Sequence, residues 1–235
     1  MKSIFKKKDV RHMGIFTGLI NLVCFLMLVA KAITHRCNWK KTDRVLMKCH
    51  KPICVLLIVS CFMHMIFVLP VLKNRSVFVT ITGIVSFFVM VSLICLCHII
   101  KEKTKKMWWH KFLAIIVAIC IVGHIVTYII DFKNYQQKVT NIVFEDIELA
   151  NMKDGTYQGE YNVGYIYAKV EVEIRNHKIV SINIVEHRNE RGEPAEKIID
   201  DMVVKQEIYV DAVSGATNSS NVIEKAVENA LNGEN

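Results

Sequence analysis

Four apolar stretches dominate the first 131 residues, and each is long enough to cross a lipid bilayer. A helix of about 20 residues covers the hydrocarbon core of a membrane, which is roughly 30 Å thick. The first stretch is too long for a removable signal peptide and lacks a small-residue cleavage site, so we expect a retained helix. The stretches predict an all-α membrane bundle of four helices, at about Met13–Thr34, Ile53–Leu72, Ser76–Ile100 and Phe112–Ile130.

The charge of the chain differs between its two parts. Residues 1–150 carry 21 Lys and Arg against 7 Asp and Glu, whereas residues 151–235 carry 9 against 15. The basic residues flank the apolar stretches, as in loops that face a charged lipid surface, and this pattern argues against a nucleic-acid partner. The loops at 31–51 and 101–111 together hold twelve Lys and Arg, against nine on the opposite side. The positive-inside rule therefore predicts a multi-pass protein of the cell membrane with its C-terminal domain outside the cytoplasm.

After Tyr135 the continuous apolar runs give way to alternation. Ala168, Val170, Val172 and Ile174 face one way and the charged residues between them the other, which is typical of a half-buried strand. Asn176-His177 predicts a tight turn, after which Val180, Ile182 and Ile184 repeat the alternation, so we expect a β-hairpin. The last segment spaces apolar residues from Val222 to Leu231 as one face of a helix, capped by Ser220 or Asn221. A small α+β domain is the expected fold.

A run of small and hydroxyl residues, Ser214-Gly-Ala-Thr-Asn-Ser-Ser220, lies between the predicted sheet and this helix. The N-terminus of a helix is a favourable place for a phosphate, because its N–H groups are unpaired there. Gly215 and Ala216 allow close approach of a ligand, and Thr217 offers a hydroxyl for esterification. Composition alone favours an ordinary capped turn over a phosphate site.

Three segments together resemble the FMN-binding domain family: Asp154-Gly-Thr-Tyr-Gln-Gly159, the hairpin residues 177–182, and Asp211-Ala-Val-Ser-Gly-Ala-Thr217. The family includes the flavin-carrying subunits of sodium-pumping quinone reductase and of Rnf complexes. In its members a flavin transferase, acting outside the cytoplasm, joins the FMN phosphate to the threonine of the Ser-Gly-Ala-Thr run. The resemblance implies covalent FMN on Thr217, with Asp211 and Ser214 in the transferase recognition run and Gly215 and Ala216 beside the cofactor.

Four of the nine histidines form a repeated pattern in the predicted bundle. His50 and His64 are 14 residues apart around the second helix, and His110 and His124 are 14 apart around the fourth. Fourteen residues turn a helix to within about 40° of four full turns and advance it roughly 21 Å, so each pair shares a face. The second and fourth helices run parallel, so His50 comes level with His110 and His64 with His124. Two stacked bis-histidine sites for b-type haem are predicted.

The segments that begin at His50-Lys-Pro-Ile and at Trp109-His110-Lys-Phe-Leu also resemble the ferric reductase-like transmembrane cytochrome domains. In that family a histidine at each end of two helices ligates two haems. This chain has four helices where six are usual, and it carries no cytoplasmic flavin and nicotinamide domain. A different interpretation remains open, in which His50 and His110 are interfacial and His64 and His124 are hydrogen-bonded helix contacts.

The sequence thus predicts a haem b bundle at residues 1–135, a linker at 136–153 and an FMN-binding domain at 154–235. We expect an oxidoreductase or its electron-transfer subunit, a transmembrane flavocytochrome with two haems and covalent FMN. Its expected partners are a flavin transferase, a donor that is a quinone or a cytoplasmic reductase, an acceptor outside the cytoplasm, and membrane lipid. The alternative is a redox sensor, or an anchor subunit of a larger complex, that holds flavin without haem.

Overall fold

The computed structural model of the protein describes residues 7–189 and 191–233, with side chains from Met13 onward. The chain forms two compact units. The first comprises the residues up to Lys73 together with Val77–Thr127, and the second comprises Asn74–Ser76 together with the chain from Tyr128. The second unit therefore begins before the expected boundary at 135. Tyr135 and Val139 of the fourth helix are buried in its core.

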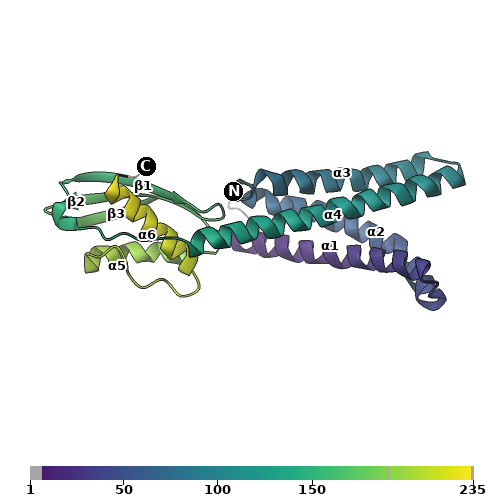
Figure 1. Ribbon diagram of the computed structural model, residues 1–235, viewed down its shortest axis with the longest axis horizontal. Coiled ribbons are helices and arrows are strands. Elements are labelled where there is room, and N and C mark those ends of the chain that lie inside the picture. Colours follow the sequence, from purple (N-terminus) through teal and green to yellow (C-terminus); the bar gives the residue numbers. More distant parts are fainter. Residues whose placement is uncertain (1–6, 190, 234–235) are drawn as a thin grey trace, which may run out of the picture. The chain divides into compact units, whose positions relative to one another are not determined.

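The first unit is built from four long helices, α1 (Lys7–Arg36), α2 (Lys40–Val68), α3 (Val77–Ile99) and α4 (Lys103–Thr140), of which α4 continues into the second unit (Figure 1). All four are long and apolar enough to cross a membrane, as predicted. A short 3-10 helix, Leu69–Asn74, follows α2.

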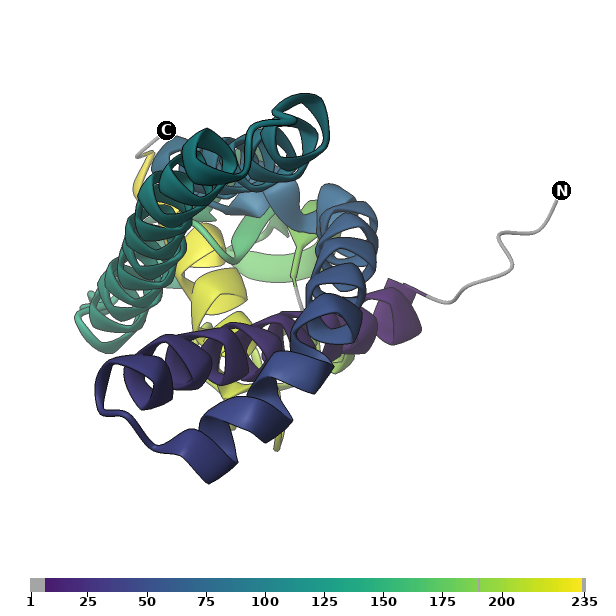
Figure 2. The ribbon, with the colours of Figure 1, turned by 90° about the vertical axis from the view of Figure 1, so that its right-hand side faces the viewer.

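Helix α1 packs closely against α2, and the two lie side by side when the bundle is seen from one end (Figure 2). Small polar side chains lie where they cross: Thr17 and Ser60 are both buried, and Ser60 Oγ donates to the Thr17 carbonyl at 3.3 Å. Large apolar side chains such as Phe78 face outward. Large apolar side chains on the outside and small polar ones between helices are expected for helices that contact lipid. In such helices, small residues let the backbones approach each other.

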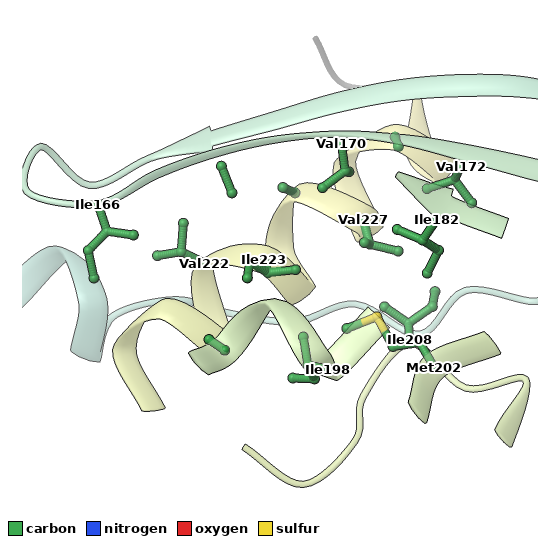
Figure 3. Close-up of a cluster of buried hydrophobic side chains, with 14 of the residues drawn as sticks. Ile166, Val170, Val172, Ile182, Ile198, Met202, Ile208, Val222, Ile223 and Val227 are labelled. Atoms are coloured by element: carbon green, nitrogen blue, oxygen red, sulfur yellow. The ribbon is translucent and has the colours of Figure 1, made fainter. Parts of the chain in front are cut away.

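The second unit contains an antiparallel sheet of three strands in the order β1 (Gly155–Asn162), β2 (Tyr167–Arg175) and β3 (Lys178–Arg188). Helices α5 (Ile198–Lys205) and α6 (Thr217–Asn232) follow, and α6 packs against β1 and β2. Figure 3 shows the core between them, in which side chains of the sheet meet those of the two helices. The core includes Val170, Val172, Ile182, Ile198, Met202, Val222, Ile223 and Val227.

The predicted hairpin is confirmed, but one residue of its second strand, Val180, was assigned to the wrong face. The four alternating residues of β2, from Ala168 to Ile174, are completely buried, and Asn176 and His177 adopt the positive φ angles of a tight turn. The register slips in β3, where Ile174 pairs with Ile179 and Glu173 with Ser181. The extra residue of this bulge shifts the alternation of β3 by one position. Val180 is therefore exposed, and Ile179 is buried in its place.

Glycine is needed where α6 crosses the first strand. A Cβ atom added to Gly159 would lie 2.2 Å from the backbone nitrogen of Ala230 and 2.5 Å from the carbonyl oxygen of Ala226. Backbone atoms of a packed helix cannot move aside as a flexible side chain can. The close approach of β1 to α6 therefore depends on the absence of a side chain at residue 159.

Candidate functional sites

The segment from Asp211 to Thr217, which we call the flavin turn after its predicted role, leads into α6, whose first residue is Thr217. Gly215 has a φ of +77°, a conformation that favours glycine, and no atoms surround its missing side chain. Ala216 N donates to the Val213 carbonyl at 2.9 Å, which closes the turn. Ala216 is buried, whereas Thr217 is exposed at the N-terminus of a sixteen-residue helix. The threonine hydroxyl is thus accessible on a fixed backbone.

The expected cap of this helix is wrong, because α6 begins at Thr217, before Ser220 and Asn221. Ser220 is instead completely buried in the first turn. Its Oγ accepts the Val213 N–H at 3.1 Å and donates to the Ala216 carbonyl at 3.3 Å. Ser220 therefore fastens the flavin turn to α6.

The other predicted residues of the turn lie at the surface. Asp211 and Ser214 are exposed. Asn218, next to Thr217, donates from Nδ2 to the Tyr135 hydroxyl at 2.9 Å. The Tyr135 ring in turn stacks on Tyr165 with centroids 4.6 Å apart. This contact joins the flavin turn to the end of α4 within the second unit.

Two buried carboxylates, which could not be recognised in the sequence, accept hydrogen bonds from Tyr209 and Val210, just before the flavin turn. Glu224 is nearly inaccessible, and its Oε1 accepts the Val210 N–H at 3.2 Å. Burial raises the pKa of Glu224 to about 7, against a smaller opposing effect of that hydrogen bond. Glu228 is completely buried and accepts from the Tyr209 hydroxyl at 2.8 Å. Glu224 and Glu228 are four residues apart on α6, which places them on the same side of the helix. In the sequence, however, both flank an apolar face and look like ordinary solvent-exposed helix residues.

A second missed cluster lies beside the first turn of α6. The His187 side chain is 2% exposed, and its Nδ1 lies 2.8 Å from Glu196 Oε1. Within the described residues, His187 Nε2 and Ser219 Oγ are buried without a hydrogen-bond partner. Gly192 presses so closely on Ser219 that a Cβ there would lie 1.7 Å from the hydroxyl oxygen. Orphaned buried polar atoms cost free energy and commonly mark functional positions.

In the first unit, the structure brings the predicted histidines of α2 and α4 together. The rings of His50 and His110 have centroids 6.1 Å apart and are nearly perpendicular, at 81°. His64 contacts α1 and His124 contacts α3. In the described part of the chain, no group of three or more His, Cys, Asp or Glu side chains could hold a metal.

The hydrogen bonds of the four imidazoles differ between the two pairs. His64 Nδ1 lies 2.9 Å from the Gly14 carbonyl, and His124 Nδ1 lies 3.1 Å from Thr82 Oγ1. His110 Nδ1 has a cysteine sulfur as its contact, and His50 Nδ1 is buried without a partner among the described residues. His64 and His124 are thus each held by a hydrogen bond to a neighbouring helix.

Comparison with known proteins assigns the second unit. Residues 164–232 match the family model of the FMN-binding domain, and the match includes the whole flavin turn. It does not extend to α1–α3. Comparison with curated proteins and with solved structures gave no match. The chain is a membrane protein of four candidate spans with a C-terminal FMN-binding domain, which indicates a redox role.

Proposed function

We propose that the protein is a transmembrane flavocytochrome, in which two b haems pass electrons between a donor and an FMN joined covalently to Thr217 outside the cytoplasm. The observation that carries this proposal is the pairing of histidines between α2 and α4 in a chain that also has an FMN-binding domain. The haem at His50 and His110 receives electrons first and the haem at His64 and His124 passes them to the flavin.

The geometry of the flavin turn supports attachment at Thr217. The hydroxyl is exposed, the backbone around it is fixed by Ser220, and open space surrounds Gly215. A phosphate there would meet the positive end of α6. Asp211 and Ser214 are exposed for a flavin transferase, while Gly215 and Ala216 allow the cofactor to approach the backbone. FMN supplies two-electron chemistry that can be fed one electron at a time.

The separation of His50 and His110 suits haem. A metal–imidazole nitrogen bond is about 2 Å long, so two imidazoles on opposite sides of one ion have centroids about 6 Å apart. The observed 6.1 Å between His50 and His110 agrees with this value. Haem iron supplies one-electron transfer, and bis-imidazole ligation suits it to that role. Four imidazoles inside membrane-spanning helices are costly unless they are paired or ligated, which also favours this function.

The side of the membrane follows from charge. Twelve Lys and Arg in the 31–51 and 101–111 loops, against nine on the other side, favour cytoplasmic placement of those loops. The FMN domain then lies outside, where its modifying transferase and its electron acceptor are expected. The donor is a quinone or a cytoplasmic reductase. Protease added to intact cells should remove the FMN domain, and a domain that is protected until lysis would reverse the topology.

One observation favours a second function. The hydrogen bonds of His64 and His124 to α1 and α3 would by themselves satisfy both imidazoles as helix contacts. The protein would then be a redox sensor, or an anchor subunit of a larger electron-transfer complex, with flavin as its sole cofactor. The absorption spectrum of the protein purified from membranes decides between the two. Soret and α bands support the flavocytochrome, and flavin bands alone support the sensor or anchor.

A further inference from the structure

The two histidines His64 and His124 are held by the same arrangement of residues on two different helices. His64 meets Gly14, Thr17 and Gly18 of α1, and His124 meets Val79, Thr82 and Gly83 of α3. In each set a backbone carbonyl is followed by a threonine three residues later and a glycine four residues later. Positions three and four apart share a helix face, so each set forms one cradle for an imidazole.

Each cradle fixes which ring nitrogen carries hydrogen. The Gly14 carbonyl lies 2.9 Å from His64 Nδ1 and can only accept a hydrogen bond, so Nδ1 is the donor. The Val79 carbonyl has the corresponding place on α3, because it lies 3.1 Å from Thr82 Oγ1, just as the Gly14 carbonyl lies 3.1 Å from Thr17 Oγ1. The threonine hydroxyls reach Nδ1 of the two histidines, at 3.4 Å for Thr17 and 3.1 Å for Thr82.

The threonine oxygens also act as acceptors toward the rings. Thr17 Oγ1 lies 2.8 Å from the Met13 carbonyl and Thr82 Oγ1 lies 2.9 Å from the Phe78 carbonyl, so each hydroxyl hydrogen has a backbone acceptor one turn earlier. The lone pairs then face the Nδ1–H groups. Within the described residues both imidazoles direct their hydrogen bonds through Nδ1, which leaves the lone pair of Nε2 available to a metal.

The glycines provide the space for the rings. A Cβ on Gly18 would lie 3.2 Å from the Cε1 atom of His64, and one on Gly83 would lie 3.0 Å from the Cε1 atom of His124. Both distances are tighter than ordinary van der Waals contact. Any side chain would push the imidazole away from the carbonyl that orients it.

We propose that Gly14–Thr17–Gly18 and Val79–Thr82–Gly83 are matching positioning sites that hold His64 and His124 as paired axial ligands of one haem, with Nδ1–H donated to the cradle and Nε2 to the iron. This inference rests on the proposed flavocytochrome function. It also makes the α1–α2 and α3–α4 hairpins two copies of one ligand-presenting unit. Among the described residues the inner histidines have no such cradle: His110 Nδ1 contacts the Cys97 sulfur at 3.5 Å, and His50 Nδ1 has no hydrogen-bond partner.

The glycines give the first test. Gly83→Ala should lose about half of the haem per FMN, while Gly123→Ala, on the same helix as His124 but with nothing within 4 Å of its added Cβ, should keep both haems. Retained FMN and the retained inner haem show that Gly83→Ala is folded. Equal haem content in the two variants overturns the inference and leaves the proposed function standing.

The threonines test positioning without a steric change. A hydrogen bond to Nδ1–H makes an imidazole a stronger donor to iron, which favours the oxidised state. Thr82→Val should therefore raise the midpoint potential of one haem and leave the other unchanged, Thr82→Ser should restore it, and Thr34→Val should have no effect. An unchanged potential in Thr82→Val, with two haems bound, overturns the cradle. Wild-type protein without any haem overturns the proposed function itself.

Discussion

In the C-terminal domain Val170, Val172 and Val227 are completely buried between sheet and helix, whereas in the bundle Phe78 is 75% exposed and Ile99 is 71% exposed. The domain derives stability from removing apolar surface from water, and the bundle shows its apolar surface to lipid. Different interactions therefore fix the positions of the side chains in the two units. In the domain, dense packing holds the flavin turn; in the bundle, hydrogen bonds and glycines orient the histidines.

The largest expected effect tests the flavin turn. Thr217→Ala should abolish covalent FMN completely while the domain stays folded, because the exposed hydroxyl contributes nothing to the core. In-gel flavin fluorescence and the mass of the peptide containing residue 217 measure the attachment. Ser214→Ala serves as a matched loss of a neighbouring hydroxyl and should retain some flavin. FMN mass found on another residue excludes Thr217 as the site.

Next in size is a change in the packed domain. Gly159→Ala should destabilise the domain by about 3 kcal/mol or more, since its Cβ would overlap backbone atoms of α6. Thermal unfolding followed by flavin fluorescence measures this loss. Gly155→Ala, on the same strand, meets only ordinary contacts at 3.7 Å and is the control. A similar melting temperature for both variants would contradict the dense packing assigned to this unit.

Removing one ligand of the bundle should have an intermediate effect. His64→Ala or His124→Ala should halve the haem content, leave FMN attached and stop reduction of the flavin from the inner side. His50→Ala or His110→Ala should also remove one haem, but an artificial reductant that reaches the outer haem should still reduce FMN. A full complement of haem in all four variants would show that these histidines are helix contacts.

The smallest effect concerns pH. Glu224 has a folded-state pKa of about 7 against an ordinary value of about 4.5, so the folded domain binds the extra proton between these values. The free energy of unfolding should therefore fall as pH rises from about 4.5 to 7. Glu224→Gln has no carboxyl group to ionise, so above pH 7 it should avoid about 1–3 kcal/mol of this loss of stability. Gln can still accept the Val210 N–H. Chemical denaturation at pH 5 and pH 8 measures the difference, and parallel pH profiles of both proteins would refute it.

The architecture, and the position of the histidines along their helices, could be predicted from the sequence because both depend on periodicity. Continuous apolar runs predict spans, the alternation in β2 predicts its buried face, and repeated spacing predicts that His50 meets His110. Long-range contacts could not be predicted in this way. The bulge at Val180 depends on pairing between strands, and the burial of Ser220 depends on where the preceding turn folds back.

The missed site residues have the same explanation. Glu224 looks like a solvated helix residue until the chain at Val210 is laid over it. The carbonyls of Gly14 and Val79 carry no signal in a sequence, since every residue has a carbonyl. The Thr17-Gly18 and Thr82-Gly83 dipeptides were visible, but their meaning depends on which helix each one packs against.

The exposed position of Thr217 has a consequence for the order of events in the life of the protein. The neighbouring residues Ala216 and Ser220 are buried, so protein contacts hold the turn from within the domain. If Thr217 carries FMN as proposed, cofactor loading becomes a late maturation step on an already folded surface. Cells without the proposed transferase should then accumulate a stable, colourless FMN domain.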